Sequence, residues 1–183
     1  MKQPIRFSVL TVSDRCASGE RDDLGGPAVV KAMVELCSAK LCDVAIVPDE
    51  IPQIIDGLRV WLDASDAPDL ILTTGGTGLA TRDVTPEATL QLLERRHDGL
   101  LELARRRCYD ITPMTYLSRG VSGTAGQTLI INLPGSSRGA HEMVEAISDI
   151  LPHAIETLRD EVGDNHPSRP KQTGVISDDH ASE

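Results

Sequence analysis

The chain has 183 residues and a formal net charge of −10, and its hydrophobic fraction of 40% is almost entirely aliphatic, with one Phe, one Trp and two Tyr. This length fits one domain with a substantial core, whereas the acidic charge and the shortage of aromatic side chains argue against a nucleic-acid-binding or membrane-binding surface. An anionic ligand would therefore need backbone N–H groups, helix N-termini, a few arginines or a bound cation.

Cysteine spacing and the N-terminal segment favour a cytoplasmic protein. Cys16, Cys37, Cys42 and Cys108 lack the paired short spacing of a zinc site, and four cysteines in a chain of this size do not make a disulfide scaffold. No leader-like segment precedes the first strand, and no apolar run is long enough to span a bilayer. We expect neither secretion nor membrane insertion.

The first half of the chain alternates predicted strands and helices. A β-rich run, Ile5–Val12, ends in Ser13-Asp14 and leads through a loop rich in Gly and Asp to a helix that begins near Pro27. A second apolar run, Val44–Val47, stops before Asp49-Glu50, and an apolar stripe then predicts a helix from about Pro52 to Ala64.

The second half begins with a third strand, Leu70–Leu72, which enters the glycine-rich loop Thr73–Gly78. The sequence Thr85-Pro86-Glu87 predicts a helix start with Thr85 as the N-cap. The stretch Leu90–Tyr109 has a helical composition that is interrupted near Asp98, and Thr112–Thr128 is irregular or hairpin-like.

A fourth strand, Leu129–Asn132, leads into the loop Leu133–Ser137 and then a long helix. The apolar face of that helix persists through Pro152, so we expect a kink there and not an end. Beyond it the sequence is polar and non-periodic. We therefore expect one domain over residues 1–160 and a flexible tail over residues 161–183.

This order of elements predicts an α/β fold with three layers, in which a mostly parallel sheet carries helices on both faces. Ligands in such folds bind beyond the carboxyl ends of the strands. Because four loops with polar side chains directly follow predicted strands, we expect these loops to converge at one edge of the sheet.

The glycine-rich loop is the strongest candidate for binding phosphate. Glycines allow positive φ angles and close backbone approach, so Gly75, Gly76 and Gly78 can turn N–H groups toward phosphate oxygens, and the Thr74 and Thr77 hydroxyls can add donors. The alternative is a tight turn that binds no ligand. The loop is neither a dinucleotide-binding fingerprint nor a P-loop.

Three carboxylates, Asp14, Asp49 and Asp83, are expected beside this loop. Because they would repel a phosphate, a magnesium ion bound by carboxylate and phosphate oxygens is the arrangement that resolves the conflict. The alternative is that Asp14 and Asp49 cap turns. The loop residues Ser13, Ser118, Arg119, Ser136 and Ser137 are either ligand-binding or ordinary turn residues.

Six motifs in order along the chain resemble the molybdopterin adenylyltransferase family, the Mog and MoaB group that includes the G domains of plant and animal molybdenum-cofactor proteins. The resemblance covers residues 6–160. The motifs are Val12–Asp14, Asp23-x-x-Gly26-Pro27, Val47–Glu50, Thr73–Gly78, Arg82–Thr89 and Ile130–Gly135.

The resemblance implies transfer of AMP from Mg-ATP to molybdopterin, with release of pyrophosphate, in a homotrimer that hands its product to the molybdate-inserting protein of the pathway. It implies that Asp49 and Asp83 are catalytic and bind magnesium. Molybdopterin or its phosphate would be bound by Thr74, Gly75, Gly76, Thr77, Gly78, Ser118, Pro134 and Gly135, and the nucleotide by Ser13, Asp14 and Gly26. Gly25, where some relatives have Ser, and Ser136-Ser137, in place of an Asn-Pro-like pair, depart from the family pattern.

Two other functions remain open at this stage. One is a delivery or scaffold protein that binds molybdopterin without adenylating it. The other is an enzyme of the related competence-damage type, which shares the fold and a similar glycine loop. The motif Arg82–Pro86 favours the adenylyltransferase family over the second of these.

Overall fold

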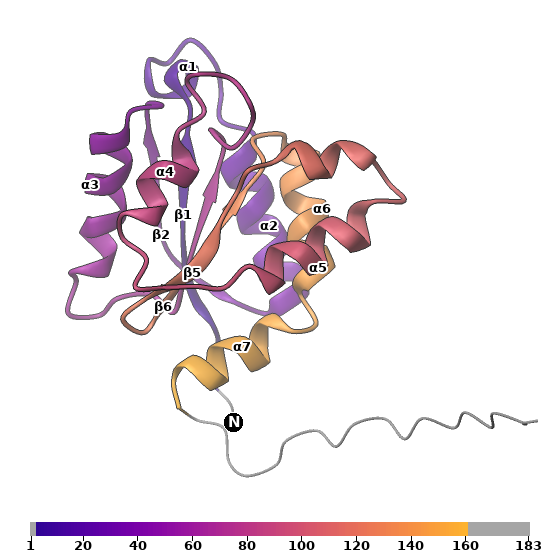
Figure 1. The fold of residues 1–183 in the computed structure, drawn as a ribbon. Helices are drawn as coiled ribbons and strands as arrows, with labels where there is room; N and C mark the ends of the chain where they lie inside the picture. Colours follow the sequence, from indigo (N-terminus) through magenta and orange to yellow (C-terminus); the bar gives the residue numbers. More distant parts are fainter. Residues whose placement is uncertain (1–2, 161–183) are drawn as a thin grey trace, which may run out of the picture.

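The computed structural model describes residues 3–160, and within them the strands form one six-stranded sheet in the order β2-β1-β3-β6-β5-β4 (Figure 1). The pairs β1–β2, β1–β3 and β3–β6 are parallel, whereas β5 pairs antiparallel with both β6 and β4. The predicted mostly parallel sheet is confirmed. The strands are β1 (Arg6–Val12), β2 (Lys40–Val47), β3 (Leu70–Thr74), β4 (Arg95–Arg96), β5 (Ser122–Ala125) and β6 (Thr128–Leu133).

Helices cover both faces of this sheet, with α3 and α4 on one side and α2, α5 and α6 on the other (Figure 1). In the part of the chain that the structure describes, no helix is both long and apolar enough to cross a membrane. The helices are α1 (Asp14–Ala17), α2 (Gly25–Cys37), α3 (Ile51–Leu62), α4 (Thr85–Leu90), α5 (Gly99–Cys108), the 3₁₀ helix η1 (Pro113–Leu117), α6 (Ser137–Ile147) and α7 (Leu151–Leu158).

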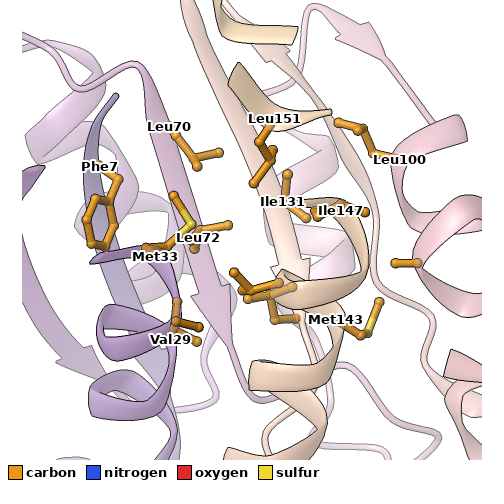
Figure 2. Packing of buried hydrophobic residues seen from close by; sticks show 14 of the residues in the cluster. Phe7, Val29, Met33, Leu70, Leu72, Leu100, Ile131, Met143, Ile147 and Leu151 are labelled. Atoms are coloured by element: carbon orange, nitrogen blue, oxygen red, sulfur yellow. The ribbon is translucent and has the colours of Figure 1, made fainter. Parts of the chain in front are cut away.

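The alternation of side chains along each strand produces two hydrophobic cores. In β3, Leu70 and Leu72 face the α2 side, and Ile71 faces the α3 side. Figure 2 shows the larger core, where residues of β1, β3 and β6 lie against Met33 of α2 and Met143 of α6. Because β3 is buried along its whole length, it fixes the position of the loop that follows it.

The segment Leu90–Tyr109, predicted to be helical with an interruption near Asp98, is helical only in its second half. Helix α4 ends at Leu90, and the chain then extends through β4 before α5 begins at Gly99. The amide of Glu94 donates to the Thr124 carbonyl at 2.8 Å, and the amide of His97 donates to the Ser122 carbonyl at 2.8 Å. Sheet pairing with β5 therefore overrides the local helical preference.

The kink predicted at Pro152 is wrong, because the chain forms two separate helices there. Helix α6 ends at Ile147, and Pro152 lies in the first turn of α7, where its missing N–H has no helical partner to lose. Ile147, Leu151 and Ile155 are all buried in one core, which explains why the apolar pattern continues from one helix into the next. The predicted tail, residues 161–183, lies outside the described residues.

A buried amide behind the glycine loop ties three elements together. Asn132 of β6 donates through Nδ2 to Thr73 Oγ1 of β3 at 2.9 Å and to Thr89 Oγ1 of α4 at 3.0 Å. Its Oδ1 accepts from the Val121 amide at 3.2 Å. All of these groups are shielded from water, so each needs its partner.

Replacing this amide should destabilise the fold. We expect Asn132→Ala to lower the free energy of unfolding by about 2–4 kcal/mol, because it strands buried polar groups and opens a cavity. Urea denaturation monitored by circular dichroism measures the change. The exposed neighbour change Gln127→Ala should stay within about 0.5 kcal/mol of wild type. Equal stability of the two variants would contradict a structural role for the Asn132 network.

Candidate active site

Four loops meet where the parallel strands end. The Ser13 amide after β1 donates to the Val47 carbonyl of β2 at 2.9 Å, and the Gly75 amide after β3 donates to the Leu133 carbonyl of β6 at 3.3 Å. The Thr74 hydroxyl donates to the Pro134 carbonyl at 2.8 Å. The expected convergence of these loops at one edge is therefore observed. The Thr74 hydroxyl, however, is already used within the protein, so its predicted role as a phosphate donor is not supported.

The glycine loop leaves β3 in a conformation that side chains rarely adopt. Gly75 has φ +102° and Gly76 has φ +60°. A Cβ on Gly75 would lie 2.1 Å from the Val12 carbonyl oxygen. One on Gly76 would lie 2.3 Å from Thr85 Oγ1. The backbone of this loop therefore lies directly against the end of β1, which requires glycine.

Thr85 orients the loop from the other side. Its hydroxyl donates to the Gly75 carbonyl at 2.9 Å, and its amide donates to the Gly76 carbonyl at 3.0 Å. Thr85 is thus not the N-cap of α4, a position that Val84 takes. With these carbonyls held away, the amides from Gly76 to Gly78 find no acceptor within residues 3–160, and these residues line a cavity. Such a row of amides suits an anion.

Asp14 and Asp49 each accept a hydrogen bond from the other's backbone. The Asp14 amide donates to Asp49 Oδ2 at 2.8 Å, and the Asp49 amide donates to Asp14 Oδ1 at 3.0 Å. Arg82 also donates to Asp14 at 2.8 Å and to Glu50 at 2.6 Å. The hydrogen bond from Arg82 lowers the pKa of Asp14. Asp14 is therefore an ion-paired carboxylate that also accepts a backbone hydrogen bond, in line with the capping alternative.

Asp49 has a different electrostatic environment, although it lies beside Asp14. Its Oδ1 faces the glycine loop, 2.9 Å from where a Cβ of Gly76 would stand. Burial raises the pKa of Asp49, and the negative charges of Asp14 and Asp83 raise it further, against the opposing effects of the hydrogen bond from the Asp14 amide and of the positive charge of Arg82. An ionised Asp49 therefore lies in an excess of negative charge, which a cation would relieve.

Asp83 lies across the loop from Asp49. Its Oδ2 accepts from the Ala80 amide at 2.8 Å and lies 2.8 Å from where a Cβ of Gly78 would stand. Two neighbouring carboxylates fit magnesium, because this ion is commonly held by one or two protein carboxylates together with substrate phosphates and water. Within residues 3–160 no group of three or more His, Cys, Asp or Glu residues could hold a metal without such help.

Arg119 fastens the C-terminal end of the glycine loop to the segment at Asp83, a role that sequence reasoning did not assign to it. Its Nε donates to the Gly78 carbonyl at 2.7 Å and its amide donates to the Thr77 carbonyl at 2.8 Å. Its guanidinium also donates to the Asp83 carbonyl and to the Glu87 carboxylate. The hydrogen bond from Arg119 to Glu87 lowers the pKa of Glu87. Arg119 therefore holds the backbone that positions Asp83.

Two cavities open on either side of the loop and share Gly76, Asp83, Gly135 and Ser136. The first measures about 320 Å³ and has apolar side chains in its wall. The second measures about 530 Å³ and is more polar. The first is also lined by Thr77, Gly78, Ser118, Pro134, Cys108, Met114, Leu117, Glu142 and Met143. The second is also lined by Ser13, Asp14, Asp49, Thr74, Gly75, Arg15 and Arg21.

These two cavities bring together all of the predicted site residues except Gly26. Gly26 lies against Asp23, where a Cβ would come within 2.5 Å of the carboxylate and within 2.7 Å of Thr11 Oγ1. The glycine is thus explained by packing, and it lines a separate apolar cavity of about 780 Å³. Glu142 and Met143 of α6 also line the first cavity. Sequence reasoning did not identify them as site residues, because a helix face that mixes apolar and acidic side chains is typical of a core boundary.

Comparison with known proteins agrees on one family. The family described as "Probable molybdopterin binding domain" matches residues 8–153. The molybdenum cofactor synthesis protein cinnamon of Drosophila melanogaster is 43% identical over 160 residues, which is 87% of this chain but 26% of that protein. The chain therefore spans about a quarter of cinnamon's length. The molybdopterin adenylyltransferase of Helicobacter pylori strain J99 is 36% identical over 85% of this chain and 89% of its own length.

The solved structures include a similar fold. The crystal structure of the molybdopterin biosynthesis enzyme MoaB from Thermus thermophilus has a TM-score of 0.79 and 47% sequence identity. The match covers 85% of this chain and 97% of that one. The three-layer α/β architecture is therefore that of this MoaB.

The close contacts around Gly76 yield a prediction with a matched control. We expect Gly76→Ala to weaken binding of molybdopterin, the phosphate-bearing ligand that the sequence resemblance implies, by at least about tenfold, because the loop must move off Thr85 and Asp49. Gly126 has φ +56° with open space around it, so Gly126→Ala should cost only about 1 kcal/mol of backbone strain and leave binding unchanged. Fluorescence titrations and melting curves on both variants give the comparison, and unchanged affinity in Gly76→Ala would exclude the loop as the phosphate site.

Proposed function

This chain belongs to the molybdopterin-binding family that matches residues 8–153, and from that premise we propose that it is a molybdopterin adenylyltransferase of molybdenum cofactor biosynthesis. It would transfer AMP from Mg-ATP to molybdopterin and release pyrophosphate. The observation that supports this reaction best is the pair of cavities that share Gly76, Asp83, Gly135 and Ser136, because two substrates that react with each other need adjoining sites. We assign this activity to the domain that the sequence predicts over residues 1–160. We also propose that the protein acts in the cytoplasm.

Each cavity suits one substrate. The first, which we call the pterin cavity, combines apolar walls at Met114, Leu117 and Met143 with the amides of the glycine loop, as a flat ring with a terminal phosphate requires. There the hydroxyls of Thr77 and Ser118, 3.3 Å apart, face the phosphate end together with Pro134 and Gly135.

The second cavity suits the nucleotide. Ser13, Asp14, Thr74 and Gly75 line it, and the exposed residues Arg15 and Arg21 place positive charge where ATP phosphates would lie. Gly26, expected to bind the nucleotide, serves the packing beneath this cavity instead.

The transfer needs alignment more than acid–base chemistry. An oxygen of the terminal phosphate of molybdopterin attacks the α-phosphorus of ATP, a new phosphoanhydride bond forms, and pyrophosphate departs with the electron pair of the broken P–O bond. The nucleophile is already an anion, so the enzyme mainly holds two polyanions together. The glycine-loop amides do this for one of them, and Arg119 keeps the loop and Asp83 in place.

Asp49 and Asp83 are the proposed catalytic carboxylates and the proposed magnesium ligands. When bound, magnesium supplies positive charge that screens the reacting phosphates. Asp49 directs Oδ1 toward the glycine loop, and Asp83 borders both cavities, so the two residues flank the place where the substrates meet.

Purified protein tests both the reaction and the two carboxylates. Wild type should convert molybdopterin and Mg-ATP into adenylated molybdopterin with one pyrophosphate per product, whereas tight binding without pyrophosphate would indicate a delivery or scaffold protein. In this assay Asp49→Asn and Asp83→Asn should each lose at least about a hundredfold in rate, because about 2.7 kcal/mol of transition-state stabilisation disappears.

Stability separates catalysis from folding in those variants. Asparagine can still accept the backbone hydrogen bonds of Asp14 and Ala80, so melting temperatures should change little. Asp56→Asn, at an exposed position of α3, is the control that should keep the full rate. Near-normal rates in both site variants, or unfolding of both, would show that the carboxylates do not serve the reaction.

We also propose that the chain forms a homotrimer through the apolar α2–β2 face, which comprises Val30, Val34, Leu41, Val44 and Ile46. Side chains on this face are exposed, with Val44 at 55% and Val34 at 48%. Strand β2 is also an edge strand, whose outer backbone groups are open to pairing. A second copy of the chain would cover both features. The molybdate-inserting protein of the pathway is the proposed recipient of the product.

Light scattering tests this assembly. Wild type should have the mass of three chains, and Val44→Lys should shift it to the monomer, because a charge on the contact face is costly to desolvate. Val60→Lys changes an equally apolar side chain, 68% exposed on α3, and should leave the trimer intact. A wild-type monomer, or a trimer that survives Val44→Lys, would contradict the proposed face.

A further inference from the structure

The pterin cavity contains a carboxylate that the transfer reaction does not use. Glu142 of α6 lines this cavity, and its side chain is only 16% exposed. Its Oε1 accepts from Arg138 Nε at 2.7 Å, but the Arg138 side chain is 79% exposed. An ion pair with one partner largely in water contributes little and does not explain why the other partner is buried.

The surroundings of Glu142 are those of a ring-binding pocket. Met143 beside it, together with Met114 and Leu117 from η1, supplies apolar surface in the same cavity. Cys108 also lines it, and burial, followed by the negative charge of Glu142, raises the pKa of that thiol. Glu142 therefore places a negative charge in a mainly apolar cavity. Its Oε1 is bonded to Arg138, and no donor within residues 3–160 is hydrogen-bonded to its Oε2.

We propose that Glu142 recognises the pyrimidine edge of the pterin ring, an inference that rests on the proposed function of the cavity. That edge presents two neighbouring donors, the N3–H and the 2-amino group, and a carboxylate offers two oxygens that accept them side by side. The glycine loop would hold the phosphate and Glu142 the far end of the ring. Glu142 is thus a specificity-determining residue that contacts substrate.

This arrangement selects for the 2-amino group. In a lumazine, a carbonyl oxygen replaces that amino group, so an acceptor would face one of the two carboxylate oxygens and only the N3–H donor would remain. Sites built to hydrogen-bond a donor reject analogues that lack it. Apolar walls alone would bind the pterin and the lumazine about equally. The ratio of the two affinities therefore tests whether Glu142 contacts the 2-amino group.

Two matched probes measure that ratio without ATP: the phosphate esters of 6-hydroxymethylpterin and of the corresponding lumazine. Fluorescence titration of wild type should show at least about tenfold preference for the pterin. Glu142→Gln should bring the ratio close to one, since an amide can both donate and accept. Glu145→Gln, on the same helix with a side chain 62% exposed, and Arg138→Gln should both retain the wild-type preference.

Steady-state adenylation separates this inference from the proposed reaction. Glu142→Gln should raise KM for molybdopterin at least about tenfold while kcat stays within about threefold, because the phosphate remains on its loop. Melting curves check that the variant is folded. A wild type that adenylates molybdopterin but shows no ring preference, or a preference that survives Glu142→Gln, would overturn the role of Glu142 alone.

Other outcomes are equally informative. Loss of preference in Glu142→Gln, in a protein that releases no pyrophosphate, would support the ring contact and refute only the transfer reaction. A wild type that binds neither probe and adenylates nothing would overturn both.

Discussion

The site depends on one close backbone contact, that between Gly75 and the end of β1. No side chain fits there, because a Cβ would stand 2.1 Å from the Val12 carbonyl oxygen. The contact holds the loop after β3 against the loop after β1, and Thr85 fixes it from the opposite side. Asn132 supports β3 from within the sheet. The glycine loop is therefore held rigidly before any ligand arrives, which is what alignment of two substrates requires.

Charge is distributed unevenly around this loop. Arg82 pairs with both Asp14 and Glu50, and Arg119 pairs with Glu87, so these cations serve the scaffold. Asp49 and Asp83 have no such cationic side-chain partner in the described residues, and the pKa of Asp49 is raised by burial and by its acidic neighbours. Under the proposed function, a protein with net charge −10 would bind anions through backbone amides and through a magnesium ion held by the two remaining carboxylates.

In the proposed function, the two cavities each recognise one substrate, and the reaction occurs at their shared boundary. Apolar walls and Glu142 lie at one end, the polar cavity with Arg15 and Arg21 at the other, and Gly76 and Asp83 at the shared boundary. Family membership and this geometry are independent lines of support for an adenylyl transfer.

The amino-acid sequence by itself determined the α/β class, the order of the main strands, the glycine loop and the family, because these depend on local periodicity and on contiguous motifs. It did not determine where Leu90–Tyr109 leaves the helix or where Pro152 starts a new one, since pairing with β5 and packing of α7 decided those. Motif position assigned different roles to Asp14 and Asp49, but it gave no physical reason for the difference, because the two side chains are chemically identical. Only the tertiary structure placed Arg82 on Asp14 and left Asp49 half-buried beside it. Only it brought Glu142 into the same cavity as residues more than sixty positions away, because side-chain environment is set by contacts between distant segments.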